Sequence, residues 1–356
     1  MKKLCVIFGG KSCEHDVSII TGMQLAKNYG NEIEKIYLGL DNKFYLATKI
    51  NSLKQFQDKT NLKLKEVIFH DSALYSKGLI SKKIFDVECV INCCHGGVGE
   101  NGDLKSFFSL HKVKCTSTNS LSAHVTMNKS LCKRLVSEVV PTVKGVCVSQ
   151  QDFEECCKLI EDEFSSELIV KPNSLGSSIG VAACDKENYQ NQIQAIFNMN
   201  DDALVEERVV DMVEYNQACM IIDGEIVLSA IEQPVSKSDF LSFDDKYNSA
   251  QKGKQADRII PADISQKLEK EINETTRQIY SLLHLEGIVR IDYIYDNKKK
   301  KLYFNEVNTI PGSMAYYLFE PIGIDYITLI NNLIQNTKDV EDYSFFETDI
   351  LKTKEI

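Results

Sequence analysis

The stretch Phe304-Asn305-Glu306-Val307-Asn308-Thr309-Ile310-Pro311-Gly312-Ser313 decides how the rest of the chain is interpreted. It continues a strand-like apolar run and ends in a Pro-Gly turn. Glu306 and Asn308 are two residues apart, so both side chains project from the same face of a strand. A carboxylate and a carboxamide side by side at the mouth of a sheet are the oxygen donors that a hard cation such as Mg²⁺ requires.

A second strand-like run, Gly-Ile-Val-Arg-Ile-Asp-Tyr at 287–293, has the same spacing. Arg290 and Asp292 share one face, and apolar residues occupy the other. Two adjacent strands would therefore offer Asp292, Glu306 and Asn308 to a metal, with Arg290 beside them for an anion. A hairpin whose polar residues are merely solvated is the alternative, and these two strands alone leave it open.

Composition excludes several classes of protein. The chain has 356 residues, 43% hydrophobic and 26% charged, which is ordinary for a soluble globular enzyme of two or three domains. Its 41 basic and 51 acidic residues give a net charge of −10, which argues against nucleic acid as the main partner. No apolar run approaches the length of a membrane span, and the short run 4–8 indicates a strand rather than a signal peptide.

The 12 cysteines do not indicate a disulfide scaffold. Several fall inside apolar runs, where a free cysteine behaves as a small hydrophobe, so we expect a reduced, cytoplasmic protein. The group Cys89, Cys93, Cys94 and His95 resembles a zinc site, but no second ligand pair at metal spacing accompanies it. We therefore expect no zinc there.

The first third of the chain alternates apolar strands, helices and glycine-rich loops, which is typical of a parallel sheet with helices on its faces. The loops at 9–12 and 95–102 then fall at the carboxyl ends of strands, where open α/β sheets bind ligands. No GxGxxG follows any strand, which argues against a Rossmann dehydrogenase. The expected elements are strands at 3–8, 33–40 and 85–94 and a helix at 16–29.

A glycine-rich hairpin at 171–181 stands out in the next block, which begins after a composition shift near 117–122. Its first strand delivers Lys171 beside a loop of Gly and Ser residues, whose backbone N–H groups can bind phosphate oxygens. A surface hairpin with flexible glycines is the alternative. The other expected elements here are a helix at 127–139 and strands at 144–148 and 203–208.

Two later segments contain patterns that suggest a function. The strand 203–208 leads through Glu207 into Val209 and Val210, and a strand-end carboxylate followed by apolar backbone suits a purine. A polar stretch at 236–257 holds Lys246 and Tyr247 and indicates a mobile lid, although a plain exposed loop explains it nearly as well. Asp263 and Gln266 then form a capping-box start for a helix.

Together these motifs resemble a known family. Phe8-Gly9-Gly10 precedes Glu14-His15-Asp16-Val17-Ser18, and His95-Gly96-x-x-Gly99-Glu100-Asn101-Gly102 follows. Then come Lys171-Pro172, Gly176-Ser177-Ser178-x-Gly180, Arg290-x-Asp292 and Asn305-Glu306-x-Asn308-Thr309-x-Pro311-Gly312. In that order and spacing the motifs resemble those of the D-alanine–D-alanine ligases of the ATP-grasp superfamily, over nearly the whole chain.

The resemblance implies a three-domain ATP-grasp fold of the α/β and α+β class, with an N-terminal parallel-sheet (pre-ATP-grasp) domain. We expect an N-terminal domain at 1–120, a central subdomain at 121–212 and a C-terminal subdomain at 213–356 that carries the lid at 236–257. It further implies a cytoplasmic enzyme, often a homodimer, with small-molecule substrates and neither a nucleic-acid nor a membrane partner. ATP and two Mg²⁺ ions (or Mn²⁺) would be required.

The implied reaction has two steps that feed peptidoglycan synthesis. ATP phosphorylates the carboxylate of one D-alanine, and the amine of a second D-alanine attacks the acyl phosphate. Such chemistry depends chiefly on positioning and charge neutralisation. The resemblance implies nucleotide contacts from Lys129, Lys171, Ser178, Glu207, Arg208, Val209, Val210, Glu214 and Lys246. Metal binding would fall to Asp292, Glu306 and Asn308.

Other positions would act on the amino acids. By the resemblance, Arg290 and the backbone of Gly312 stabilise the tetrahedral oxyanion of the second step. Glu14 would anchor the ammonium group of the first substrate and form a hydrogen-bonded trio with Ser177 and Tyr247. The remaining substrate contacts implied are His95 near the first amino acid and Tyr317 and Leu318 near the second. Glu100 has a structural alternative, as a carboxylate at a helix start.

The departures from the family pattern concern the second amino acid most. The family usually has serine then leucine where this chain has Tyr317 and Leu318, which reshapes the pocket for that substrate. Asn128 replaces a usual aspartate before Lys129, and Met212 a common glycine. A ligase with a different second substrate, such as D-serine, is therefore the close alternative. A nucleotide-binding regulator with a degenerate site is the alternative from another class.

Overall fold

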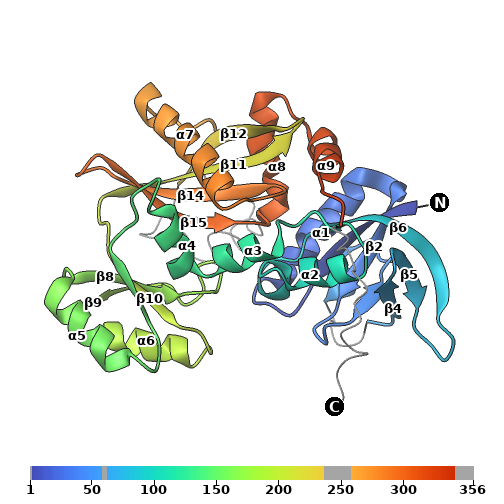
Figure 1. Cartoon of the computed structure of the whole chain (residues 1–356), viewed down its shortest axis with the longest axis horizontal. Helices are drawn as coiled ribbons and strands as arrows, with labels where there is room; N and C mark the ends of the chain where they lie inside the picture. The colour runs from blue at the N-terminus through green and yellow to red at the C-terminus, as the bar shows by residue number, and fades with distance from the viewer. Residues whose placement is uncertain (1, 58–61, 236–257, 341–356) are drawn as a thin grey trace, which may run out of the picture.

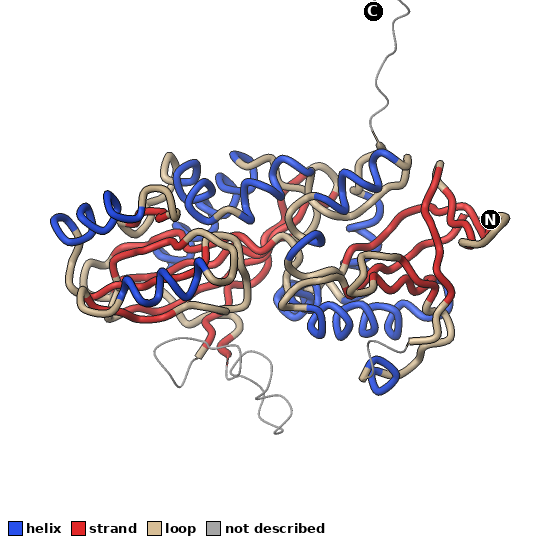
Figure 2. The backbone as a smooth tube through the Cα atoms, turned by 90° about the horizontal axis from the view of Figure 1, so that it is seen from below, coloured by secondary structure: helices blue, strands red, loops and turns tan. Residues whose placement is uncertain are grey.

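The computed structural model describes residues 2–57, 62–235 and 258–340. Within these ranges the chain forms three sheets, each with helices packed on it (Figure 1). The view at a right angle shows the sheets and their helices from below (Figure 2). No helix in the described ranges is long and apolar enough to cross a membrane.

The first sheet closes into a barrel of six strands. Strand β1 lies parallel to β2 and β6, as the buried apolar run Cys5–Phe8 predicted. The other neighbours pair antiparallel, because β3, β4 and β5 form hairpin connections that the sequence pattern did not reveal. The strands are β1 (Lys2–Gly9), β2 (Ile33–Leu38), β3 (Phe44–Leu46), β4 (Lys65–His70), β5 (Ala73–Ser76) and β6 (Lys82–Asn92).

Two helices cover the barrel, α1 (His15–Tyr29) and α2 (Asp103–Leu110). The core beneath α1 contains Phe8 and Leu25 and continues into the C-terminal part of the chain through Leu318 and Leu329. Burial of this shared apolar surface holds the barrel against the last sheet. The barrel's glycine-rich loops are thereby fixed beside the C-terminal strands.

The second sheet has four antiparallel strands in the order β7-β10-β8-β9. Helices α5 and α6 pack on it around a core that includes Ile160, Val170 and Ile193. This unit lies at the lower left of Figure 1. Its elements are β7 (Gly145–Val148), α5 (Phe153–Glu163), β8 (Glu167–Pro172), β9 (Ala182–Asp185), α6 (Tyr189–Phe197) and β10 (Ala203–Glu207).

The third sheet has five antiparallel strands in the order β13-β12-β11-β14-β15. Cys132 and Val136 of α4 share its core with Leu268 and Ile272 of α7, so α4 packs on this sheet although it precedes the second sheet in sequence. The elements are α3 (Ser120–Met127), α4 (Lys129–Val136), β11 (Met212–Ile222), β12 (Glu225–Pro234), β13 (Arg258–Ile259), α7 (Gln266–Leu282), β14 (Val289–Asp296), β15 (Lys301–Asn308), α8 (Tyr316–Phe319) and α9 (Tyr326–Gln335).

Two expected helix boundaries were wrong. The helix expected at 127–139 is the shorter α4, because Met127 ends α3 and Asn128 leaves helical geometry, its side chain accepting the backbone N–H of Leu131 at 3.0 Å as the N-cap of α4. The cap of α7 is Ser265, which accepts the N–H of Leu268, and not the expected Asp263. The division at 120/121 and 212/213 stays a prediction, and the expected lid at 236–257 lies outside the described residues.

Candidate active site

A row of polar side chains crosses the third sheet. Strand register places Glu232 of β12 opposite Asn216, Asn216 opposite Asp292, and Asp292 opposite Glu306 of β15. Residues that are directly opposite in a sheet share one face, so these four side chains form a continuous row. The two carboxylates singled out from the sequence therefore lie side by side.

Arg290 and Asn308 form the next pair along β14 and β15. The guanidinium of Arg290 donates to both carboxylate oxygens of Asp292, at 2.7 and 2.8 Å, and the amide of Asn308 donates to Oδ2 at 3.0 Å. Burial alone would lower the pKa of Arg290, but the charge of Asp292 raises it well above its ordinary value. Arg290 is thus a fixed cation within this face of the sheet.

The donor set fits a magnesium site in its chemistry. Two carboxylates and one carboxamide, from Asp292, Glu306 and Asn308, project from paired positions, and all three can offer oxygen. Within the described ranges no group of three or more His, Cys, Asp or Glu side chains could hold a metal by itself. Mg²⁺ typically uses one or two protein carboxylates together with substrate phosphates and water, so this smaller set suits it.

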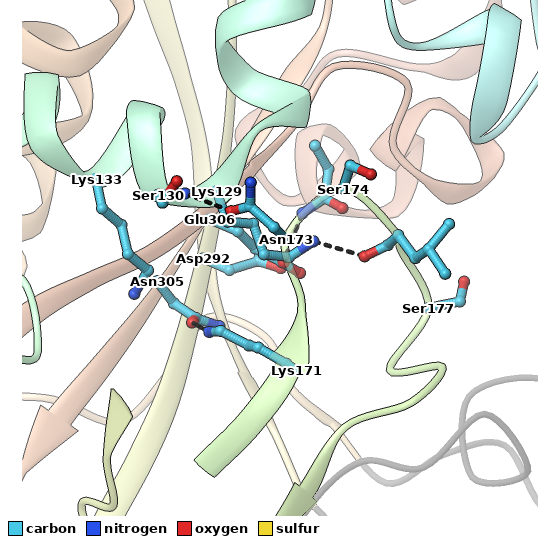
Figure 3. Close-up of polar contacts among 12 residues, drawn as sticks. Lys129, Ser130, Lys133, Lys171, Asn173, Ser174, Ser177, Asp292, Asn305 and Glu306 are labelled. Carbon is cyan, nitrogen blue, oxygen red and sulfur yellow. Dashed lines mark hydrogen bonds and ion pairs between the residues drawn. The ribbon is translucent and has the colours of Figure 1, made fainter. Parts of the chain in front are cut away.

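Lys129 is the first residue of α4 and lies beside these carboxylates. Its Nζ lies 3.9 Å from Oε2 of Glu306 and donates to the carbonyl of Leu175 at 2.5 Å (Figure 3). Asn173 holds the start of the helix, because its carbonyl accepts the N–H of Lys129 and its side chain accepts that of Ser130. Burial lowers the pKa of Lys129, although the charge of Glu306 opposes this.

Lys171 of β8 belongs to a second charged cluster. Its Nζ lies 2.7 Å from Oε2 of Glu206. It also donates to the side chain of Asn305 at 3.2 Å (Figure 3). Lys133 of α4 lies 2.6 Å from the other oxygen of Glu206. Burial alone would raise the pKa of Glu206, but Lys133 and then Lys171 lower it to about 2. Burial lowers the pKa of Lys133 to about 8.

A cavity lies between the second and third sheets. Residues expected to bind the nucleotide line it from both sides, namely Lys129, Lys171, Ser178, Glu207, Arg208, Val209 and Glu214. Glu206, Asn305, Asp292 and Glu306 line it as well. Val210 does not, since its side chain is largely exposed and it is not among the lining residues. Lys246 lies outside the described residues.

A smaller cavity adjoins the first. Both cavities are lined by Lys129, Leu175, Gly176 and Glu306, while Glu14, Glu100 and Asn308 line only the smaller one. The two cavities therefore meet at the lysine and carboxylate that face each other, Lys129 and Glu306.

Glu14 reaches the smaller cavity from the barrel. It accepts a hydrogen bond from the hydroxyl of Ser177, which belongs to the hairpin loop of the second sheet. A Cβ added to Gly96 or Gly176 would lie 2.8 Å from Oε2 of Glu14, so a side chain at either position would force the carboxylate or the loop to shift. Two members of the expected trio are thus in contact, and the third, Tyr247, lies outside the described residues.

His95 and Glu100 tie the barrel to the segment that follows β15. Oγ1 of Thr21 lies 3.0 Å from Nε2 of His95. Burial lowers the pKa of this imidazole to about 4, so it is neutral at neutral pH. Glu100 accepts the backbone N–H groups of Gly96 at 2.7 Å and Ile310 at 3.0 Å. Burial, and then the charge of Glu14, raise the pKa of Glu100 to about 8. Its role is therefore not that of a carboxylate at a helix start.

The segment after Gly312 has an unusual backbone. Ser313, Met314 and Ala315 all have left-handed φ angles of 51°, 57° and 49°, a conformation that non-glycine residues rarely adopt. Leu318 is buried in the core shared with the barrel and is not among the described residues that line either of the two cavities. Tyr317 donates its hydroxyl to Glu232, at the far end of the polar row.

Family models cover most of the chain. The model described as D-ala D-ala ligase N-terminus matches residues 3–118, and the one described as D-ala D-ala ligase C-terminus matches residues 138–335. The chain is 32% identical to the D-alanine–D-alanine ligase of Campylobacter jejuni subsp. doylei, over 93% of this chain and 92% of that protein. The chain belongs to the D-alanine–D-alanine ligase family.

Solved structures of similar fold include members of the same family. The D-alanine–D-alanine ligase of Helicobacter pylori matches with a TM-score of 0.80 and 27% identity, over 95% of this chain and 99% of that one. The VanG D-Ala:D-Ser ligase of Enterococcus faecalis matches with a TM-score of 0.80 and 27% identity, over 94% and 98%. The expected ATP-grasp fold is therefore confirmed.

Two residues of the candidate site, Lys133 and Glu206, were not predicted from the sequence, nor was the contact between Glu100 and Ile310. Lys133 carried a usable signal, since it lies one helical turn after Lys129 and so on the same face of α4. Glu206 carried none, because its partners Lys133 and Lys171 are far from it in the sequence and only the fold brings them together.

Proposed function

We propose that this family member joins two D-alanines in an ATP-dependent reaction through an acyl-phosphate intermediate. The observation that carries the proposal is the meeting of the two cavities at Lys129 and Glu306. The larger cavity would hold ATP and the smaller one the first D-alanine. The γ-phosphate would then lie next to the carboxylate it is transferred to, which is the positioning that phosphoryl transfer requires.

The first step needs positive charge around the phosphates. Lys129 and Lys171 supply it, and Glu206 and Asn305 hold Lys171 in place. Asp292, Glu306 and Asn308 would hold Mg²⁺ or Mn²⁺, which neutralises phosphate charge when bound. Glu14, held by Ser177, would receive the ammonium group of the first D-alanine and so direct its carboxylate toward Lys129.

The second step develops negative charge on the acyl oxygen as the amine attacks. Arg290 keeps its proton under all physiological conditions and is fixed by Asp292, so it can donate to that oxygen without rearranging. The backbone N–H of Gly312 would be the second donor. The neutral His95, which contacts Thr21, would lie near the first amino acid.

The proposal also includes the enzyme's location, oligomeric state and pathway. We propose a cytoplasmic homodimer that acts in peptidoglycan synthesis, on the resemblance to the family. A second candidate function is ligation of D-alanine to D-serine. It is favoured by Tyr317, at a position where the family usually has serine, and by the likeness to a D-Ala:D-Ser ligase.

The test is Mg²⁺-dependent phosphate release from ATP by the purified protein, with D-Ala, D-Ser, D-lactate and L-Ala singly and in pairs. Products are identified by mass. D-Ala alone giving D-Ala-D-Ala supports the main proposal, and release only with D-Ala and D-Ser supports the second candidate. ATP binding without release for any pair would contradict both and favour a regulator.

A further inference from the structure

Three side chains form a cluster at the β12 end of the polar row. The buried carboxylate of Glu232 accepts the hydroxyl of Tyr317 at 3.3 Å and lies 3.3 Å from Nη1 of Arg258. The guanidinium of Arg258 lies over the ring of Tyr317, 4.5 Å from its centroid. Cation–π stacking and a carboxylate partner together fix the plane of the guanidinium.

The hydroxyl of Tyr317 is not available to bind an anion. A phenol has one proton, and here it is donated to Glu232. Burial, and then the charge of Glu232, raise the pKa of Tyr317 to about 12, so the hydroxyl stays protonated at neutral pH. A substrate carboxylate needs donors, and this hydroxyl has none left to offer.

Arg258 has donors to offer. A guanidinium carries five N–H groups in a planar fork, and within the described ranges Glu232 is the carboxylate that faces it, through Nη1. The Arg258 side chain is 38% exposed, whereas that of Glu232 is 4% exposed. One edge of the fork can therefore bind a second carboxylate from the accessible side.

The cluster also adjoins the proposed reaction centre. Glu232, which accepts the Tyr317 hydroxyl, lies on the same face of the sheet as Asp292 with Asn216 between them, and Asp292 binds Arg290. In an α-amino acid the carboxylate is separated from the amine by a single carbon atom. A group that binds the carboxylate of the attacking amino acid must therefore lie beside Arg290, the proposed oxyanion donor.

We propose that Arg258, and not the hydroxyl of Tyr317, receives the α-carboxylate of the second amino acid, with the ring of Tyr317 as its platform. Glu232 is then a positioning residue that fixes both side chains. The inference rests on the proposed function and names the determinant for the second substrate. It predicts selectivity for a carboxylate on the attacking amine, whether that amine belongs to D-alanine or D-serine.

The test compares Arg258→Gln with Tyr317→Phe, each against the wild-type protein. The KM for the second amino acid is measured, together with the ratio of kcat/KM for D-alanine and D-alaninamide as acceptors. Arg258→Gln is expected to raise this KM about thirtyfold and to abolish most of the preference for the carboxylate, because a charge-assisted contact is lost. The KM for the first amino acid and for ATP should change far less.

Tyr317→Phe keeps the aromatic platform and removes only the hydroxyl. It should raise the KM for the second amino acid no more than about threefold, as expected when a hydrogen bond to a positioning residue is lost. Arg258→Lys, which keeps the charge but not the fork, should fall between the two other variants. The selectivity ratio is decisive, because a purely structural role of Arg258 would not change it.

The opposite pattern overturns the inference. If Tyr317→Phe loses the preference for D-alanine over D-alaninamide and Arg258→Gln keeps it, the hydroxyl binds the carboxylate. This outcome leaves the proposed function intact, because the wild-type protein still forms a dipeptide. A wild-type protein that forms no dipeptide with any D-amino acid pair overturns the proposed function, and the inference with it.

Discussion

Lys133 Nζ lies 2.6 Å from Oε1 of Glu206, and both side chains are about 5% exposed. The same carboxylate binds Lys171 through its other oxygen. One buried carboxylate is thus shared by two lysines, only one of which lines the proposed ATP cavity. Glu206 therefore holds Lys171 in place, and Lys133 keeps Glu206 ionised although it is not among the residues that line the cavity.

Glu206→Gln should be strongly destabilising. The substitution removes the carboxylate that pairs with two buried lysines, and breaking a buried ion pair by removing one partner costs about 3 kcal/mol. The midpoint of urea unfolding should fall, and the KM for ATP should rise because Lys171 is no longer held. Glu207→Gln is the matched control for stability, since Glu207 is less buried and, among the described residues, accepts the backbone N–H of Ser165 without an ion pair to a lysine. Equal loss of stability in both variants would contradict the assignment.

The same carboxylate should make stability depend on pH. Its pKa is about 2 when folded and 4.5 is its ordinary value, so the folded state favours the ionised form. The stabilisation is fully present above about pH 4.5 and is lost as the pH falls toward 2. The difference in unfolding midpoint between the wild-type protein and Glu206→Gln should therefore shrink below pH 4.5. A difference that stays constant from pH 7 to pH 3 would show that Glu206 is not ionised in the fold.

Local spacing predicted the part of the site that lies on one hairpin. Arg290, Asp292, Glu306 and Asn308 could be found because a period of two places each pair on one face, and hairpin pairing then brings the two pairs together. The contact between Glu100 and Ile310 could not, because 210 residues separate the two. No local pattern records which distant backbone N–H a carboxylate meets, and that depends on how the barrel packs against the third sheet.

The fold, like the site, was predicted where the sequence signal is local and missed where it is not. The buried run at Cys5–Phe8 predicted the parallel centre of the barrel, but the short strands β3 and β5 carry too few residues for their alternation to be recognised. Glu206 was not predicted for a comparable reason. It lines the same cavity as the predicted Glu207, but its partners Lys133 and Lys171 belong to other elements, and only the fold brings them together.

Gly176→Ala should impair binding of the first amino acid. The new methyl group would lie 2.8 Å from Oε2 of Glu14, so either the hairpin loop or the carboxylate must move. We expect the KM for the first amino acid to rise about tenfold, as when a charge-assisted hydrogen bond is lost, with a smaller change in the KM for ATP. Gly78→Ala is the control, since a Cβ there meets nothing closer than 3.8 Å. An unchanged first KM would show that Glu14 does not bind that substrate.

Arg290→Ala should lose stability as well as turnover. Asp292 would keep its charge on a largely buried face without the two N–H groups that now bind it, which costs about 3 kcal/mol. Arg290→Lys retains the charge but not the two-pronged geometry, so it should unfold closer to the wild type while its kcat stays low. Urea unfolding and steady-state kinetics of both variants check this. A lysine variant with normal kcat would remove Arg290 from the oxyanion role.

Glu306→Gln should abolish turnover and leave the fold intact. Its side chain is 24% exposed and, among the described residues, Lys129 lies 3.9 Å from it, so the attraction lost to Lys129 is weak and screened. The neutral amide would still offer oxygen to Mg²⁺ but without charge, so phosphate release should fall by more than about a hundredfold at saturating ATP, as expected when a charged metal ligand is lost. Titration with Mg²⁺ and with Mn²⁺ separates weakened metal binding from damaged chemistry, since only the former is rescued at high metal concentration. A folded Glu306→Gln protein with near-normal rate at low Mg²⁺ would contradict the proposed metal site.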